Sequence, residues 1–221
     1  MDAKGNIAGA VKRFEIVTEA DARALEYGSS IMVVRGGHVT PLAADTLRSR
    51  RVSVAWESGS GDDRHLVPVS PARTVAVAGD HASLALKAAI VGHLRARGVA
   101  AHDLGTAGSE PVDYPDTAAA AARQVARGEA DAAIVIDGAG LGSTIAANKV
   151  RGVRAAMCLN QTLARYARQH NGANVLALGA TLVSVEEALA IVDTFLETPM
   201  TEARYIRRLS KIHDLEERPR S

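Results

Sequence analysis

Short apolar runs alternate with longer amphipathic segments along the chain from residue 74 onward. Five of the runs have the length and apolar character of buried strands: TVAVAGD, VAAHDLG, DAAIVID, VRAAMCL and NVLALGA. The segments between them repeat apolar residues with helical spacing, and two more helices, SVEEALAIVDTFLET and EARYIRRLSKIHDLEERP, are predicted after the last run. Strand–helix alternation at this spacing predicts right-handed crossovers. We therefore expect residues 73–221 to form an α/β domain with a Rossmann-like parallel five-stranded sheet flanked by helices.

The first 70 residues predict a small α+β module. VTEADARAL is typical of a helix with Thr18 as N-cap and Asp21 three residues later, and VTPLAADTLRSRR is typical of a helix capped by Thr40. SSIMVV and RVSVAWE are typical of strands. The module is too small for a functional site to be assigned to it.

A linker separates these two parts. Residues 58–63 are glycine, serine and acidic residues, and prolines follow at positions 68 and 71. The sequence therefore predicts an N-terminal module at residues 1–70 and a separate domain at residues 73–221.

Composition and charge narrow the class of protein. Hydrophobic residues make up 47% of the chain and charged residues 23%, which is the profile of a globular protein with a core. The formal net charge of +1 disfavours nucleic acid or an anionic membrane surface as the main partner. No apolar stretch approaches the roughly 18 residues that span a bilayer, and the N-terminus lacks the long apolar segment of a secretory signal. The single cysteine, Cys158, excludes an intrachain disulfide and predicts a buried, unreactive thiol, so we expect a cytoplasmic protein.

The carboxyl ends of the predicted strands carry the candidate chemistry. Asp80 and His81 follow the first strand, and Asp137 follows the third, ahead of the glycine-rich turn GAGLG. Ligands of open parallel sheets bind at this edge, and the N–H groups of such a turn can hold an anion. The turn lacks the lysine–serine pair of a P-loop and follows the third strand, which disfavours a dinucleotide cofactor. The alternatives are a tight turn without a ligand, and an Asp80 that only caps a helix beside a solvated His81.

Two further groups of polar residues lie on predicted helices. His170 and Asn171 end one helix, where a histidine also complements the helix dipole. Arg204, Arg208 and Lys211 share one face of the last helix, where paired guanidinium groups suit phosphate, although such a run is usually a solvated face. The seven histidines show no metal-ligand spacing, so we expect no metal.

Five stretches follow the order seen in the family of ribose-5-phosphate isomerase B and its galactose-6-phosphate isomerase relatives. They are AVAGDHASLALK, DLGT with VDYPD, IDGAGLGSTIAANKVRGVRAA, ARQHNGANVLALGA and ARYIRRL, so that residues 73–213 resemble this family. The resemblance implies an aldose–ketose isomerase of a small sugar phosphate, ribose 5-phosphate or a close analogue. It also implies a cis-enediolate intermediate, no metal or organic cofactor, and a homodimer with shared active sites, or a tetramer built from it.

The resemblance assigns roles to residues at the strand edge. The resemblance implies that Asp80 and His81 lie beside the substrate hydroxyls and phosphate, with Asp80 as a catalytic residue. It also implies that Tyr114 lines the sugar. Three glycines are expected to stabilise the enediolate oxygen through their N–H groups: Gly138, Gly140 and Gly142.

Other roles are implied for residues on the helices. The resemblance implies that His170 reaches in from the second subunit and helps to open the sugar ring, with Asn171 beside it. It also implies that Arg204 and Arg208 bind the phosphate.

Two positions depart from the family pattern. Many members carry a cysteine base where this chain has Asp137, and others use a glutamate where this chain has Ser143. Our hypothesis is that Asp137 is the base, provided that burial, helped by the like charge of Asp80, raises its pKa. The alternatives are that Asp137 orients hydroxyls or marks a changed substrate. Thr181 stands where relatives often have a phosphate-binding arginine, for which Arg207 or Lys211 are candidate replacements.

The N-terminal module has its own resemblance. Its VTPLA core is similar to a short segment of some enzymes associated with bacterial microcompartments, which implies targeting or assembly. The alternative is a module for dimerisation or stability. A second function therefore stays open: a catalytically weakened sugar-phosphate-binding protein or microcompartment-associated scaffold.

Overall fold

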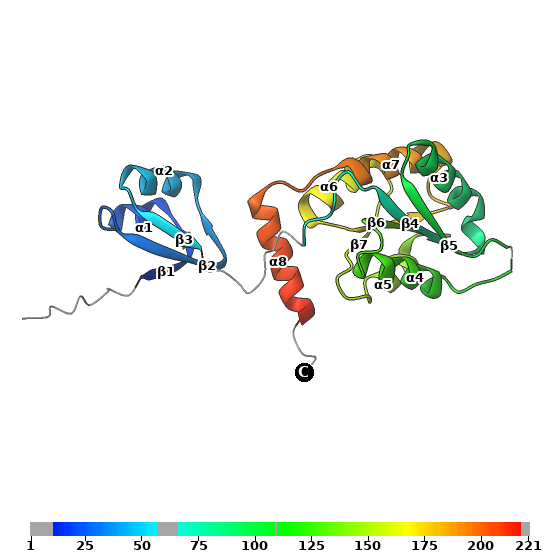
Figure 1. Ribbon diagram of the computed structural model, residues 1–221, viewed down its shortest axis with the longest axis horizontal. Helices are drawn as coiled ribbons and strands as arrows, with labels where there is room; N and C mark the ends of the chain where they lie inside the picture. Colours follow the sequence, from blue (N-terminus) through cyan, green and yellow to red (C-terminus); the bar gives the residue numbers. More distant parts are fainter. Residues whose placement is uncertain (1–10, 57–65, 109, 218–221) are drawn as a thin grey trace, which may run out of the picture. The chain divides into compact units, whose positions relative to one another are not determined.

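The computed structural model describes residues 11–56, 66–108 and 110–217 (Figure 1). The chain divides into two units, residues 1–62 and residues 63–221, and each is described by itself. The linker predicted at residues 58–63 lies outside the described residues. Among the described residues, no helix is both long and apolar enough to cross a membrane.

The second unit contains a five-stranded sheet in which every pairing is parallel, as predicted. Its spatial order is β5-β4-β6-β8-β7. The strands are β4 (Thr74–Gly79), β5 (Ala100–Gly105), β6 (Ala132–Asp137), β7 (Ala155–Met157) and β8 (Val175–Gly179). The chain leaves β4 for β5 on one side and reaches β6 on the other, so the carboxyl ends of β4 and β6 flank the topological switch point.

Helices cover both faces of this sheet (Figure 1). One layer consists of α3 (Leu84–Ala96), α6 (Gln161–Asn171) and α7 (Val185–Glu197), and the other of α4 (Tyr114–Ala126) and α5 (Leu141–Ala147). Side chains alternate along β4, so Val75 and Val77 pack in the first layer while Ala76 and Ala78 pack in the second. The second layer is built mainly from alanines, which lets α4 lie close to the sheet.

The last helix, α8 (Ala203–Glu217), packs against the end of α6. Gly172 follows α6 with a φ of +58°, and a Cβ at this position would lie 2.6 Å from Leu209 Cδ2. Leu209 shares a small buried cluster with Leu66, Met200 and Tyr205. Only a glycine permits this close approach, which fixes α8 on the C-terminal end of α6.

Two arginines hold residues 66–69 on this second unit. Arg154 Nη2 donates to the carbonyl oxygen of Leu66 at 2.9 Å, and Arg168 Nη2 donates to that of Val69 at 2.6 Å. The linker composition and the prolines at positions 68 and 71 predicted an N-terminal module that ends at residue 70. In the structure, residues 66–69 pack with the second unit.

The first unit is a smaller sheet of three parallel strands in the order β1-β2-β3. Its elements are β1 (Lys12–Val17), α1 (Glu19–Ala24), β2 (Ser30–Val39), α2 (Pro41–Ser49) and β3 (Ser53–Trp56). The predicted helices and two of these strands are confirmed, and Thr18 forms a capping box with Asp21. The sequence did not predict β1, because Val17 is its one fully buried residue and the strand has no clear apolar pattern.

Candidate active site

Asp80 and Asp137 lie side by side at the switch point. Gly79 of β4 pairs with Ile136 of β6, and the N–H of Asp80 donates to the carbonyl oxygen of Ile136 at 3.2 Å. The two aspartates are therefore one register step beyond this pair, on neighbouring strands. Both are buried, with 7% of Asp80 and 5% of Asp137 exposed. The topology thus gathers two carboxylates where ligands of such sheets bind.

The Asp80 carboxylate caps the short 3₁₀ turn that follows β4. Its Oδ1 accepts a hydrogen bond from the N–H of Ala82 at 3.0 Å, within η2 (His81–Ser83). The capping alternative is therefore realised, and the same side chain also remains at the strand edge.

The Asp137 carboxylate binds the backbone of the glycine loop. Its Oδ1 accepts hydrogen bonds from the N–H groups of Ala139, at 2.8 Å, and Gly140, and its Oδ2 accepts one from the N–H of Ser143 at 2.7 Å. The donors come from the turn and from the first turn of α5. Asp137 therefore acts as an internal anion around which the loop is folded.

These hydrogen bonds decide the ionisation of Asp137. Burial raises its pKa, but hydrogen bonds from Ser143, Gly140 and Ala139 outweigh burial and lower the pKa below the ordinary aspartate value. The expectation that burial raises this pKa toward neutrality is wrong, because the carboxylate enters the interior together with its donors. Asp137 is accordingly ionised at neutral pH.

The glycine loop keeps two N–H groups available for a ligand. Among the described residues, the N–H groups of Gly138 and Gly142 have no acceptor, whereas that of Gly140 binds Asp137. Gly140 has a φ of +77°, and a Cβ there would lie 2.9 Å from the carbonyl carbon of Leu178. The turn therefore requires glycine at position 140. Of the three N–H groups that were expected to stabilise an oxyanion, that of Gly140 is engaged with Asp137.

Tyr114 and His81 border the same loop. A Cβ on Gly142 would lie 2.4 Å from Tyr114 Cε2, so the tyrosine ring covers that glycine. His81 is exposed, and its Nδ1 faces the N–H of Val112 at 3.4 Å. This contact brings the segment before α4, and with it Tyr114, to the carboxyl edge of the sheet.

Thr181 holds the loop from the other side, in a role that the sequence did not reveal. Its Oγ1 donates to the carbonyl oxygen of Gly138 at 2.7 Å, and its backbone N–H donates to the same oxygen at 3.0 Å. The sequence drew attention to Thr181 because it departs from the family pattern. Its hydrogen-bond partner, Gly138, could not be inferred because it lies 43 residues away in the chain.

The remaining predicted residues form a second cluster. His170 and Asn171 end α6, which runs back from the carboxyl end of β7 to the amino end of β8, and Arg204 and Arg208 lie on α8 next to them. The five residues of β8 span about 17 Å. The structure therefore gathers Asp80, His81, Tyr114, Asp137 and the glycine loop at one edge. It does not bring the second cluster to that edge within one chain.

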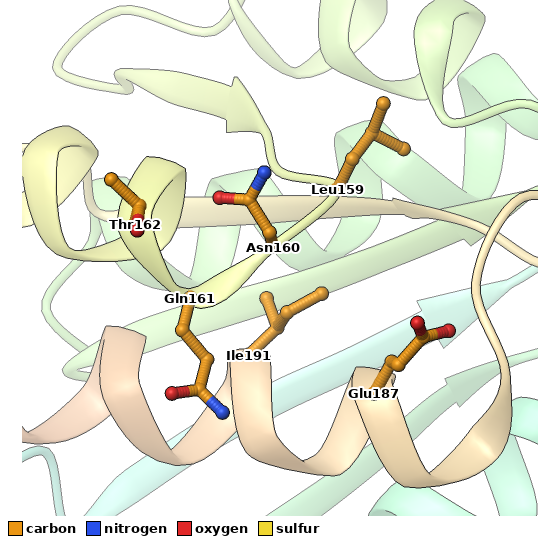
Figure 2. Close-up of a pocket in the computed structure, with 6 residues that line it drawn as sticks. All are labelled: Leu159, Asn160, Gln161, Thr162, Glu187 and Ile191. Atoms are coloured by element: carbon orange, nitrogen blue, oxygen red, sulfur yellow. The ribbon is translucent and has the colours of Figure 1, made fainter.

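Two other features lie near the carboxyl edge. A cavity of about 290 Å³ opens between the start of α6 and α7 (Figure 2), lined by Leu159, Asn160, Gln161, Thr162, Glu187 and Ile191. Asn160 and Glu187 are engaged there as helix caps. Cys158 is buried, as predicted, and burial raises the pKa of its thiol to about 12. No group of three histidine, cysteine or acidic side chains in the described part of the chain is placed to hold a metal ion.

Known proteins share the domain that carries this site. Residues 75–212 match the Ribose/Galactose Isomerase family. Ribose-5-phosphate isomerase B of Escherichia coli (strain K12) is 43% identical over 146 residues, which cover 66% of this chain and 98% of that protein. The structure of Clostridium thermocellum ribose-5-phosphate isomerase B is 46% identical, with a TM-score of 0.63, over 65% of this chain and 97% of that one.

A third relative has been solved with a sugar phosphate. The structure of ribose-5-phosphate isomerase B from Mycoplasma genitalium with bound ribulose-5-phosphate is 38% identical, with a TM-score of 0.63, and covers 66% of this chain and 97% of that one. The parallel sheet, the strand-edge carboxylates and the glycine loop all lie within the matched residues. This chain therefore belongs to the Ribose/Galactose Isomerase family.

Proposed function

We propose that this protein interconverts an aldose and a ketose phosphate, ribose 5-phosphate and ribulose 5-phosphate or a close analogue. The observation that carries the proposal is the pair of unoccupied N–H groups, on Gly138 and Gly142, beside two buried carboxylates at the switch point. Such donors stabilise an oxyanion that forms during proton transfer. Family membership and the relative solved with ribulose-5-phosphate support the same reaction.

The reaction needs two proton movements that these residues can serve. Ring opening breaks the C1–O4 bond, forms the C1 carbonyl and moves a proton from the C1 hydroxyl to O4, and we assign it to His170. Isomerisation removes the proton from C2, gives a cis-enediolate, transfers the O2 proton to O1 and returns a proton to C1. The N–H groups of Gly138 and Gly142 stabilise the enediolate oxygen, and no metal or organic cofactor takes part.

The loop makes Asp137 a weak base in this structure. Its oxygens accept three hydrogen bonds from the loop, two at Oδ1 and one at Oδ2, and these bonds stabilise the carboxylate against uptake of the C2 proton. A substrate oxygen that takes over some of these donors frees the carboxylate. Burial then dominates and favours uptake of a proton.

A homodimer completes the proposed site. His170, Asn171, Arg204 and Arg208 lie away from the carboxyl edge within one chain, and α5 and α6 expose Leu141, Ile145, Leu163 and Tyr166. We propose that a second copy covers these apolar residues and brings its own His170 cluster to the carboxyl edge. A tetramer of two such dimers is compatible with the same contact.

The N-terminal unit carries a separate proposal. Its residues lie outside the family match, and it has its own parallel sheet and buried core. We propose that this unit, residues 1–62, serves assembly or targeting, with association with a bacterial microcompartment as the specific form, inside the cytoplasm. The alternative function, a weakened sugar-phosphate-binding scaffold, is favoured by the engagement of Asp137 with the loop.

Solvent-deuterium exchange at C2 of ribose 5-phosphate, followed by proton NMR, tests the function. We expect exchange and ribulose 5-phosphate formation in the native protein, and loss of both in Asp137→Asn. Equal rates in the two proteins would exclude Asp137 as base. Absence of exchange, also with four- to six-carbon sugar phosphates, would favour the binding protein.

A further inference from the structure

Three aromatic rings stack where α6 ends and α8 begins. The imidazole of His170 lies between Tyr166 and Tyr205, with centroid separations of 4.6 Å and 4.4 Å and interplanar angles of 16° and 28°. Tyr166 is four residues before His170 on α6, so the two share a helix face. Tyr205 comes from the first turn of α8. The imidazole is covered on both faces, so it cannot change rotamer without losing a ring contact.

Tyr205 also contacts the two arginines assigned to phosphate. Arg204 Nη2 donates to Tyr205 Oη at 2.7 Å, and its Cζ lies 4.6 Å from the ring centroid, while Arg208 Cζ lies 5.9 Å from the same centroid. A guanidinium group within about 6 Å of an aromatic centroid is attracted to the ring. Glu202 Oε2 also pairs with Arg204 Nε at 2.7 Å. Tyr205 therefore links His170, Arg204 and Arg208.

The tyrosine itself is firmly held. Only 6% of Tyr205 is exposed, and it packs with Leu66, Met200 and Leu209. Leu209 lies against Gly172, one residue beyond the end of α6. Tyr166 differs from Tyr205 in two ways. It is 47% exposed, and the cation–π contacts described for Arg204 and Arg208 are made with the ring of Tyr205.

We propose that Tyr205 is a positioning residue that fixes His170, Arg204 and Arg208 as one preassembled unit for the active site of the partner subunit. The inference rests on the proposed function, which assigns ring opening to His170 and phosphate binding to the arginines. In a furanose 5-phosphate, the ring oxygen is joined to the phosphate through C4, C5 and O5. The substrate therefore limits the spacing between imidazole and guanidinium groups to a short range, and Tyr205 holds the groups within that range.

Two reactions separate this role from general destabilisation. Consumption of ribose 5-phosphate requires ring opening, whereas deuterium exchange at C1 of ribulose 5-phosphate does not, because the phosphorylated C5 oxygen of this ketose cannot close a ring. Both are measured in the full chain for the native protein, Tyr205→Leu, Tyr205→Phe and Tyr166→Leu. Binding of inorganic phosphate, by calorimetry, supplies a readout that is independent of turnover.

Tyr205→Leu should lose alignment of both His170 and the arginines. We expect kcat/KM for ribose 5-phosphate to fall about tenfold, the exchange reaction to fall less, and phosphate binding to weaken several-fold. Tyr205→Phe keeps the stack and the cation–π contacts and loses the hydrogen bond from Arg204, so we expect kcat/KM within about threefold of native. Tyr166→Leu should slow ring opening and leave phosphate binding unchanged.

Equal loss of the two reactions in Tyr205→Leu, with native phosphate affinity, would overturn the proposal, because lower folded fraction reduces both reactions alike. Failure of the proposed function has a different signature: the native protein itself then catalyses neither reaction. In that case the affinity for inorganic phosphate still tests whether Tyr205 positions the arginines. Equal affinity of the native protein and Tyr205→Leu would show that Tyr205 does not position the arginines.

Discussion

The carboxylate of Asp137 accepts a hydrogen bond from the N–H of Ser143 at 2.7 Å, which joins the end of β6 to the first turn of α5. With the bonds from Ala139 and Gly140, this contact closes the glycine loop on a single buried anion. A thiol at this position could not form three comparable bonds, because sulfur is a weak acceptor. The carboxylate of Asp137 therefore determines how the loop is held.

Asp137→Asn should destabilise the protein. The amide offers one acceptor oxygen where the carboxylate offers two, and its NH₂ group faces a backbone donor. We expect the free energy of unfolding at pH 7 to fall by about 1–3 kcal/mol, as for other buried donors left without an acceptor. Urea denaturation measures the change, with the exposed Asp45→Asn as control, which should change the free energy by less than about 0.5 kcal/mol. A native-like stability of Asp137→Asn would contradict the anchoring role.

The same contact predicts a pH dependence. Because the pKa of Asp137 is lowered in the folded protein, its stabilisation is complete above the unfolded value, about 3.9, and is lost as the pH falls through the folded value. We therefore expect the stability difference between the native protein and Asp137→Asn to be constant from pH 7 to 5 and to shrink below pH 4. A difference that grows on acidification would contradict the lowered pKa.

Thr181→Val should loosen the glycine loop. The valine lacks the hydroxyl that donates to the Gly138 carbonyl oxygen at 2.7 Å, while the backbone N–H bond at 3.0 Å remains. We expect kcat to fall about three- to tenfold and the free energy of unfolding to fall by about 1 kcal/mol, since one hydrogen bond is lost. Steady-state kinetics with Thr181→Ser as the conservative control tests this, because serine retains the donor. Loss of activity in Thr181→Ser alone would argue against the hydroxyl.

Gly142→Ala should displace Tyr114. The added Cβ would lie 2.4 Å from Tyr114 Cε2, so the ring has to leave its place over the loop. We expect KM for the sugar phosphate to rise, while the global fold is retained. Gly92→Ala is a matched control in α3, where a Cβ meets nothing within 4 Å. It should stabilise the protein by about 0.5–1 kcal/mol and leave KM unchanged. An unchanged KM in Gly142→Ala would remove Tyr114 from the sugar site.

The sheet and its functional edge could be predicted from the sequence, because each depends on local pattern. All six residues of β6 are buried, so the strand appears as an uninterrupted apolar run that ends in Asp137. Parallel topology then puts Asp80 and Asp137 at the same edge of the sheet, whereas the strand order that makes them neighbours comes from the structure.

The ionisation of Asp137 and the role of Tyr205 could not be predicted. The first depends on where the N–H groups of the turn point, which is set by the left-handed Gly140 and by Thr181, in the turn after β8 and 43 residues from its partner Gly138 in the chain. The second depends on how α8 packs against α6, which Gly172 and Leu209 decide through close contact. Both features depend on distances between segments that are far apart in the chain, and the spacing of residues in the sequence does not reveal those distances.

Mixing two inactive variants should restore activity if the site is shared between subunits. Asp80→Ala damages the carboxyl edge and His170→Ala damages the second cluster, and these lie at opposite ends of the strands within one chain. Random pairing makes half of the dimers mixed, and each mixed dimer contains one site with both residues intact. We therefore expect about a quarter of native activity after the two variants are unfolded and refolded together. Each variant refolded alone is the control. Because a site built within one chain would always carry its own lesion, a mixture no more active than its components would refute the shared site.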